Sequence, residues 1–351
     1  MYTPIMPQPA VPVRINLYSD TQTKPTRAMR ETMLDAEVGD EQRGMDPTIN
    51  ALCARVAALF GKEAAMFLPS GTMCNEIAIL THCRAGDEIL AHETAHIITA
   101  EGGAPGALAG ARVLPLTGAK GQFSAETLRA ALTDRSRYAA PQTLMVAEQT
   151  ANLGGGTIWP LAALNEVAAI AHEAGMATHM DGARLMNAVV ASGIAAADYA
   201  ASFDTVWLDF TKGLGAPLGA VLAGSQNLID RAWLWKQRIG GALRQGGVCA
   251  AACLYALDHH VARLADDHAN AKRLAAGLRG IQGLAVQEPE TNLVYLDVTD
   301  PQRTPGDWAA SLLGQGIMVS VMSSKRLRLC THLDVSAADI DETIAAFRAV
   351  N

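Results

Sequence analysis

Residues 209–219 read DFTKGLGAPLG, a lysine among glycines directly after the apolar run TVWLDF. Glycines after a strand can form a phosphate-binding loop, as in the dinucleotide fingerprint G-x-G-x-x-G and the P-loop G-x-x-x-x-G-K-S/T. Neither pattern fits, because Gly213, Gly215 and Gly219 are spaced G-x-G-x-x-x-G and Lys212 precedes them. The stretch therefore indicates a lysine whose own amine reacts, beside glycines that let a flat cofactor approach the backbone.

The composition is that of a compact enzyme. The chain has 351 residues, enough for one large domain and a smaller one. Its net charge of -7 and its lack of Lys/Arg blocks argue against nucleic acid as the main partner and favour a small ligand. The N-terminus MYTPIMPQPAVPVR has no basic start followed by an apolar block, and no apolar run has the ~18 residues of a membrane span, so we expect a cytoplasmic protein.

The cysteines show no metal-binding or redox spacing. None of the six forms a C-x-x-C pair, so we expect reduced thiols that are mostly buried. They are Cys53, Cys74, Cys83, Cys249, Cys253 and Cys330.

Short apolar runs alternate with helical patterns through most of the chain. The predicted strands are AAMFL, EIL, RVLPL, TLMVAE, MATHM, TVWLDF and PLGAVLA. The predicted helices fall at about 47–60, 72–83, 124–134, 160–174 and 225–239. This alternation predicts an α/β fold with a mostly parallel sheet sandwiched by helices.

The C-terminal part has a different pattern. A long helical stretch begins at about residue 248, and the strands TNLVYLDV and RLRLCTHLDV follow it. We expect a small α+β domain over residues 251–351, a large cofactor-binding domain over 31–250, and an N-terminal arm, 1–30, that packs with the small domain.

Ligands of such sheets gather at the carboxyl ends of the strands. There, Ser70, Gly71 and Thr72 open a helix whose N-terminus suits a phosphate, while Asp181 and Lys212 follow two other strands. Pyridoxal phosphate requires these groups: a lysine for the Schiff base, an aspartate that keeps the pyridine nitrogen protonated, and a phosphate cradle.

Seven segments carry a resemblance to a known family. They read YSDTQTKPT, VGDEQRGMDPTINAL, FLPSGTMCN, HMDGARLMNA, TKGLGAPLG, GGALRQGGV and LRLCTHLDV. In this order they resemble the signature segments of the low-specificity L-threonine aldolases, fold type I pyridoxal-phosphate enzymes, over roughly residues 14 to 340. The resemblance is strongest to the phenylserine aldolase branch, and it implies reversible cleavage of L-3-hydroxy-α-amino acids to glycine and an aldehyde.

The resemblance also implies roles for single residues. Lys212 would be the Schiff-base lysine, Asp181 the pyridinium partner, and His96 the ring stacked on the cofactor and the candidate base. The remaining expected contacts are Ser70, Gly71 and Thr72 for the phosphate, Arg184 for the ring hydroxyl, Ser19 and Arg328 for the substrate carboxylate, and Arg244 for a phosphate of a neighbouring subunit. We therefore expect a homo-oligomer, most simply a homotetramer, whose active sites are shared across a dimer interface.

Two alternatives remain open. The first keeps the cofactor but changes the reaction to β-elimination or transamination, because a fold does not fix the chemistry. The second is a zinc hydrolase, because residues 92–96 read HETAH and match H-E-x-x-H. That motif needs a helix, whereas EILAH reads as a strand, so we expect no metal site and a structural His92.

Three positions depart from the family pattern. Ala151 stands where many relatives have a histidine beside the substrate hydroxyl, Ala100 where an aromatic residue is frequent, and Arg43 in place of a tyrosine. The two alanines favour a wider apolar pocket and hence a preference for 3-phenylserine over threonine.

Overall fold

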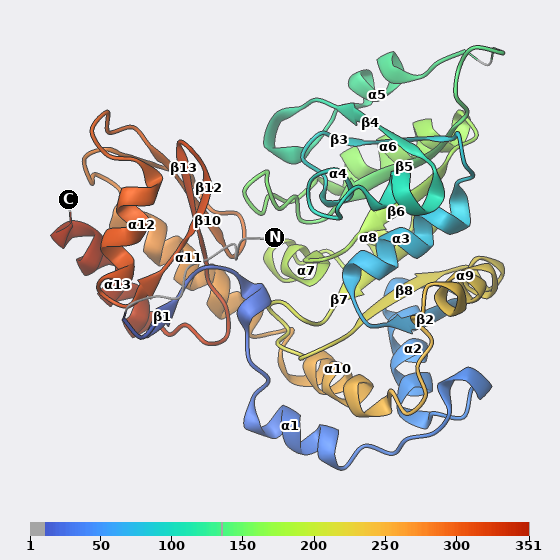
Figure 1. Cartoon of the computed structure of the whole chain (residues 1–351), viewed down its shortest axis with the longest axis horizontal. Coiled ribbons are helices and arrows are strands. Elements are labelled where there is room, and N and C mark those ends of the chain that lie inside the picture. Colours follow the sequence, from blue (N-terminus) through green and yellow to red (C-terminus); the bar gives the residue numbers. More distant parts are fainter. Residues whose placement is uncertain (1–10, 135, 351) are drawn as a thin grey trace. The chain divides into compact units, whose positions relative to one another are not determined.

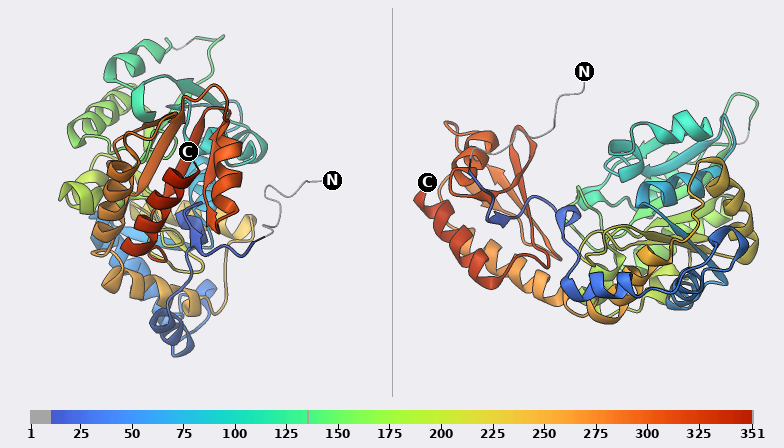
Figure 2. Two further views of the ribbon diagram at one scale, coloured as in Figure 1. Left: turned by 90° about the vertical axis from the view of Figure 1, so that its left-hand side faces the viewer. Right: turned by 60° about the horizontal axis from the view of Figure 1, so that its bottom comes forward.

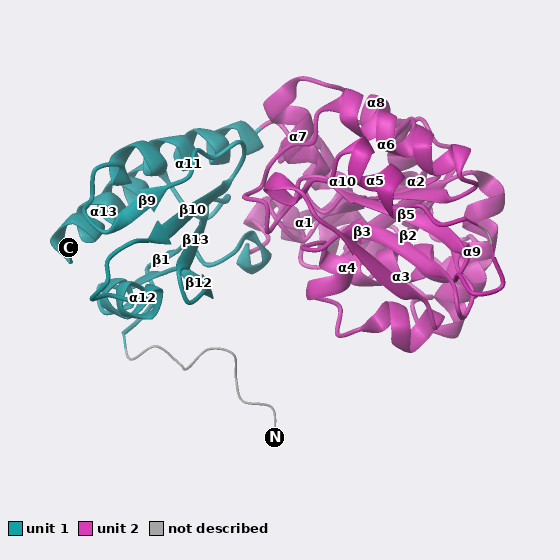
Figure 3. Ribbon diagram, turned by 90° about the horizontal axis from the view of Figure 1, so that it is seen from above, with its two compact units in different colours: residues 1–23, 263–351 teal, residues 24–262 magenta. Residues whose placement is uncertain are grey.

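The chain folds into two compact units. The computed structural model describes residues 11–134 and 136–350. Residues 24–262 form the larger unit, and the described residues of 1–23 and 263–351 form the smaller one (Figure 3). Each unit has its own sheet.

These units divide after residues 23 and 262, whereas the sequence predicts boundaries after 30 and 250. The packing of α10 (Gly247–His259) explains the difference. This helix contacts α1 (Arg27–Leu34) and α2 (Pro47–Phe60), so it and the end of the predicted arm belong to the larger unit.

The larger unit is built on a seven-stranded sheet (Figure 1). In spatial order the strands are β2 (Ala64–Leu68), β8 (Ala220–Gly224), β7 (Thr205–Asp209), β6 (Ala177–Asp181), β5 (Gln142–Glu148), β3 (Glu88–His92) and β4 (Arg112–Leu116). Only β8 runs antiparallel to its neighbours among these strands. The predicted mostly parallel sheet is confirmed.

Helices cover this sheet (Figure 2). The helix α3 (Gly71–His82) contacts α9 (Gln226–Arg238), and α6 (Leu161–Glu173) contacts α5 (Ala125–Ala131) and α8 (Ala196–Ala200). Every residue of β3, β7 and β8 is buried, as expected of strands covered on both faces. No helix in the described ranges is long and apolar enough to cross a membrane.

The predicted long helix after residue 248 is interrupted. The helix α10 ends at His259 and α11 (Leu264–Leu278) begins five residues later. Between them, buried His260 places Nδ1 2.7 Å from the carbonyl oxygen of Leu214. The sequence has no glycine or proline at this break. The end of α10 therefore coincides with a tertiary contact and has no signal in the local sequence.

The smaller unit holds a four-stranded antiparallel sheet. Its order is β12 (Ser320–Ser323), β13 (Arg326–Cys330), β10 (Leu293–Val298) and β9 (Leu284–Val286). The helices of this unit are α11, α12 (Pro305–Leu313) and α13 (Ala337–Ala349). The N-terminal strand β1 (Ile15–Asn16) pairs in parallel with β11 (Ile317–Met318). Both ends of the chain therefore contribute to one core, which includes Leu17, Leu296 and Phe347.

Candidate active site

The stretch at 209–219 forms the tight connection between antiparallel β7 and β8. The backbone N–H of Phe210 donates to the oxygen of Gly219 at 3.1 Å, and the N–H of Gly215 donates to the oxygen of Lys212 at 2.9 Å. Gly219 has a φ of 132°, and a Cβ there would lie 2.7 Å from Cys253 Sγ. This glycine is thus required by the turn and by its packing against Cys253.

Lys212 is held three residues beyond the end of β7. Its Nζ lies 2.7 Å from Asp209 Oδ2, and its side chain is 15% exposed. The same amine lies 5.7 Å from the ring centroid of Trp207. A cation close to a carboxylate and an indole face is restrained, yet part of it stays accessible to a ligand.

Asp181 is the last residue of β6 and is buried. Its Oδ1 accepts a hydrogen bond from the N–H of Ala183 at 3.0 Å, and its Oδ2 accepts one from Asn75 Nδ2 at 2.8 Å. Burial raises the pKa of Asp181, while the charges of His96 and Lys212 oppose that rise. The three predicted groups therefore act on one another electrostatically at the carboxyl ends of β6 and β7.

His96 begins the short helix α4 (His96–Thr99). Its Nδ1 lies 2.8 Å from Glu101 Oε1, and its backbone N–H donates to Glu148 Oε2 at 3.2 Å. Burial lowers the pKa of His96, but the hydrogen bond to Glu101 and the charge of Asp181 outweigh burial, so the pKa lies above its ordinary value. The contact between Nδ1 and Glu101 thus fixes the orientation of the His96 ring.

The helix α3 supplies the predicted phosphate cradle. Ser70 is its N-cap and accepts from the N–H of Met73 at 3.2 Å. Gly71 follows, and a Cβ there would lie 2.1 Å from the Trp207 ring. First-turn amides have no acceptor within their helix, and they favour an anion. Ser70 and Thr72 are exposed, so this helix end is open to a ligand.

The two predicted arginines of this unit have different surroundings. Arg184, just before α7 (Leu185–Ser192), is 5% exposed and donates from Nη1 to Asn152 Oδ1 at 3.4 Å. Arg244 has a side chain that is 60% exposed, and its Nη1 lies 3.0 Å from Asp40 Oδ2. Arg184 is thus built into the larger unit, whereas Arg244 lies on its surface.

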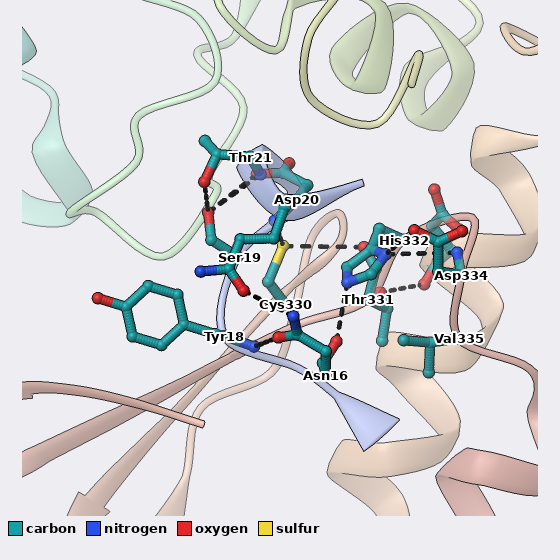
Figure 4. A network of polar contacts seen from close by, with 12 residues as sticks. Asn16, Tyr18, Ser19, Asp20, Thr21, Cys330, Thr331, His332, Asp334 and Val335 are labelled. Atoms are coloured by element: carbon teal, nitrogen blue, oxygen red, sulfur yellow. Dashed lines mark hydrogen bonds and ion pairs between the residues drawn. The ribbon is translucent and has the colours of Figure 1, made fainter. Parts of the chain in front are cut away.

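Ser19 and Arg328 belong to the smaller unit. Ser19 Oγ accepts from the N–H of Thr21 at 3.2 Å and from its hydroxyl at 2.9 Å (Figure 4). Arg328, in β13, donates from Nη2 to the carbonyl oxygen of Tyr18 at 3.3 Å and is 8% exposed. The structure therefore brings the two predicted carboxylate contacts to the same backbone segment.

The HETAH residues do not share a helix. His92 ends β3, and its Nδ1 and Nε2 lie 2.8 Å from Thr94 Oγ1 and 3.1 Å from the oxygen of Gly118. His96 lies beyond a turn and faces Glu101. Among the described residues no group of three or more His, Cys, Asp or Glu side chains is placed to hold a metal ion.

Four buried polar residues of this region were not predicted. Asn75, Glu76 and Glu101 are 0%, 3% and 7% exposed, and Glu148 ends β5 opposite Asp181. Burial and the neighbouring Glu101 raise the pKa of Glu76 to about 9, and burial and the charge of Asp181 raise that of Glu148 to about 7. The one available sequence signal is Asn75 and Glu76 within the otherwise mostly apolar pattern of α3.

The three positions that depart from the family pattern differ in their exposure to solvent. Ala151 is 2% exposed, and its Cβ lies 2.7 Å from where a Cβ on Gly121 would stand. The space predicted at Ala151 is therefore partly filled by the backbone near Gly121. Ala100 is exposed, and Arg43 has a 77% exposed side chain 3.8 Å from Asp40.

Comparisons with known proteins agree with this geometry. A model of the beta-eliminating lyase family matches residues 16–301. The chain is 38% identical over 339 residues to the low specificity L-threonine aldolase of Escherichia coli K12, covering 95% of this chain and 98% of that protein. It is 36% identical over 341 residues to low-specificity L-threonine aldolase 1 of Arabidopsis thaliana, covering 95% of each.

A solved structure shows the same fold. The threonine aldolase of Leishmania major superposes with a TM-score of 0.83 at 21% identity, covering 96% of this chain and 100% of that one.

Proposed function

Because the chain belongs to the beta-eliminating lyase family and, within it, to the low-specificity L-threonine aldolases, we propose that it is a pyridoxal-phosphate-dependent aldolase. It cleaves L-3-hydroxy-α-amino acids reversibly to glycine and an aldehyde. One observation carries the proposal: a partly accessible amine on Lys212 and a buried, doubly hydrogen-bonded carboxylate on Asp181 act on each other at one edge of the sheet.

The donor set fits the cofactor. The N-terminus of α3, with Ser70, Gly71 and Thr72, suits its phosphate, Lys212 supplies the amine that binds it covalently, and Asp181 suits a protonated ring nitrogen. Arg184 is proposed beside the ring hydroxyl. When bound, the cofactor supplies an electron sink for the pair released from the Cα–Cβ bond.

Residues of the protein would bind the substrate and transfer the protons. Arg328, with Ser19, would hold the substrate carboxylate, because a guanidinium can bind it through two parallel hydrogen bonds. His96 would take the proton of the β-hydroxyl as the Cα–Cβ bond breaks, so that the aldehyde leaves and Cα is reprotonated to give glycine. Asp181 would keep its negative charge throughout and thereby hold a proton on the ring nitrogen.

The proposal includes a substrate range and an assembly. Threonine, allo-threonine and phenylserine-like substrates are all proposed, with the aryl substrate preferred because Ala100 is exposed and no histidine stands at position 151. Because the space at Ala151 is partly filled, we expect a smaller preference for 3-phenylserine over threonine than if both Ala100 and Ala151 left open space. We also propose a homo-oligomer, most simply a tetramer, in which Arg244 serves a neighbouring active site.

Products distinguish this function from its nearest rival. The family match leaves β-elimination as the second candidate, and that reaction releases ammonia and a keto acid instead of glycine and an aldehyde. We expect glycine and benzaldehyde from 3-phenylserine, and glycine and acetaldehyde from threonine. Comparing kcat/KM for the threo and erythro forms of both substrates measures the preference.

The role of Lys212 is tested separately. Lys212→Ala should lose turnover and the visible absorbance of covalently held cofactor, because no amine remains to bind it. Lys325→Ala, a change at an exposed lysine, should retain both. A Lys212→Ala protein that still holds the cofactor in a form fixed by borohydride would refute the assignment.

A further inference from the structure

The side-chain amide of Asn75 has one possible orientation. Trp207 Nε1, which can only donate, lies 2.7 Å from Asn75 Oδ1. The opposite atom, Nδ2, lies 2.8 Å from Asp181 Oδ2 and 2.7 Å from Glu101 Oε1. Both amide hydrogens are therefore directed at carboxylates, one at each.

The orientation of Asn75 also settles the histidine behind it. Because Asn75 Oδ1 accepts, His179 Nε2, at 3.1 Å, must donate. His179 Nδ1 then accepts from Thr205 Oγ1 at 2.8 Å, and that hydroxyl oxygen accepts from His82 Nε2 at 3.1 Å. Burial lowers the pKa of His179 to about 3 and that of His82 to about 4, so both stay neutral.

One carboxylate oxygen of Glu101 has two hydrogen-bond partners. Its Oε1 accepts from Asn75 and lies 2.8 Å from His96 Nδ1. Glu76 is buried near it, and burial together with Glu101 raises the pKa of Glu76 to about 9, so Glu76 is protonated at neutral pH. With Glu101 Oε1 acting as the acceptor, the hydrogen of His96 is on Nδ1.

We propose that Asn75 and Glu101 are positioning residues that set the protonation of Asp181 and His96 together. Asn75 donates to both carboxylates, which favours their charged forms, and Glu101 accepts the Nδ1 hydrogen of His96. The remaining ring nitrogen, Nε2, is thereby the one that exchanges a proton with the β-hydroxyl. Only this last step rests on the proposed function, because the network itself belongs to the folded chain.

Other charged groups also act on His96. Asp181 is a negative neighbour, Glu148 is an acidic one whose pKa is raised to about 7, and Lys212 is a positive neighbour that opposes them. Glu101 is the one acidic side chain for which a described contact reaches the ring itself. Replacing Glu101 with glutamine preserves the shape but removes the charge, so the proton affinity of His96 must fall.

The test measures His96 directly. We would label the cofactor-free protein with 13Cε1-histidine, assign the His96 signal with His96→Gln, and titrate wild type and Glu101→Gln by NMR. The His96 pKa should fall by about one unit or more, a roughly tenfold loss of proton affinity. Glu93→Gln removes an exposed carboxylate three residues from His96 and should leave the pKa unchanged, whereas Glu101→Asp should restore part of the shift.

Turnover and cofactor binding complete the test. In the loaded enzyme the acid limb of kcat/KM should move to lower pH in Glu101→Gln, because a base with a lower pKa is deprotonated at lower pH. Asn75→Asp replaces the amide that donates to Asp181 with a second carboxylate, which disfavours the charged form of Asp181. With the fold checked by circular dichroism, pyridoxal phosphate binding should weaken about tenfold.

Three results would overturn the inference: an unchanged His96 pKa in Glu101→Gln, an unchanged pH profile despite a shifted pKa, or unchanged cofactor affinity in Asn75→Asp. If instead the His96 pKa shifts in Glu101→Gln but the wild-type enzyme forms no glycine, the network is upheld and the proposed function is refuted.

Discussion

Trp207 connects packing to electrostatics through one indole. Its ring leaves no room for a side chain at Gly71, the first residue of α3, while its Nε1 orients Asn75 and so the donors to Asp181. A change in the position of this ring would therefore alter the proposed phosphate cradle and the hydrogen bonding of Asp181 together.

Gly71→Ala tests this dependence. The new methyl would stand 2.1 Å from the indole, so either the ring or the helix end must move. We expect the free energy of unfolding to fall by about 1–3 kcal/mol, as for an overpacked core, and pyridoxal phosphate to bind more weakly. Urea unfolding and cofactor titration measure the two effects.

Gly306→Ala is the matched control. Gly306 lies in the first turn of α12, and a Cβ there would approach nothing closer than 3.5 Å. This substitution should be neutral or slightly stabilising, because alanine favours a helix over glycine. Equal effects of the two substitutions would contradict the packing argument.

The positions of single residues were predictable where a residue type and its place after a strand suffice. Ser70, Asp181 and Lys212 follow apolar strands, and the structure places them at the strand ends. Glu76 and Glu101 could not be found that way, because their importance comes from burial beside one another. Burial of a carboxyl pair depends on tertiary packing, which no local pattern shows.

The helix α2 shows what a cap does beyond its own helix. Asp46 Oδ1 accepts from the N–H of Ile49 at 2.9 Å, as an N-cap does. Its Oδ2 accepts from the N–H of Gly39 at 3.2 Å and of Gly247 at 2.9 Å, which joins three segments of the larger unit. Asparagine is as good an N-cap as aspartate, but its amide nitrogen cannot accept.

Asp46→Asn should therefore be costly despite its conservative character. The half-buried N–H of Gly39 and the buried N–H of Gly247 would face an amide nitrogen, and we expect a loss of about 1–3 kcal/mol in the free energy of unfolding. Ser225→Asn is the control, because Ser225 accepts one cap hydrogen bond, from Leu228 at 3.3 Å. Unfolding by urea should show a small effect there, and a small effect at Asp46 as well would contradict the argument.

The elements themselves were largely predictable. The sequence predicted a helix over about 47–60, and the structure confirms the bounds of α2. It missed the break between α10 and α11, where a tertiary contact of His260 and not a helix breaker marks the end. It also could not predict the two-residue pairing of β1 with β11, because so short a strand leaves no periodic signal.

On the scale of the whole molecule, the chain enters the smaller unit twice. Its N-terminal strand β1 pairs with β11, and Leu17 packs in the same core as Phe347 near the other end. Strands whose partners are distant in sequence are slow to form, because loop closure precedes their contacts. The division after residues 23 and 262 follows from this packing; the sequence predicted an N-terminal arm that packs with the small domain but placed its end at residue 30.

The proposed sharing of active sites is the remaining claim about the assembly. Arg244 lies on the surface, paired with Asp40 of its own chain, so turning toward a second subunit would break one exposed ion pair and disturb no core. If it serves a neighbouring site, the Lys212→Ala and Arg244→Ala defects of a mixed dimer fall in the same active site. One site then has both defects and the other has none.

Co-expression of Lys212→Ala and Arg244→Ala subunits with two affinity tags should recover turnover that neither variant has alone. With random pairing, half of the dimers are mixed and each has one intact site, so activity should reach about a quarter of wild type. Mixing Lys212→Ala with Asp181→Asn is the control, since both residues belong to the same chain's site and every mixed site keeps one defect. If tandem purification yields hybrids without recovered activity, Arg244 does not act between subunits, and if the control mixture also recovers, the recovery does not come from shared sites.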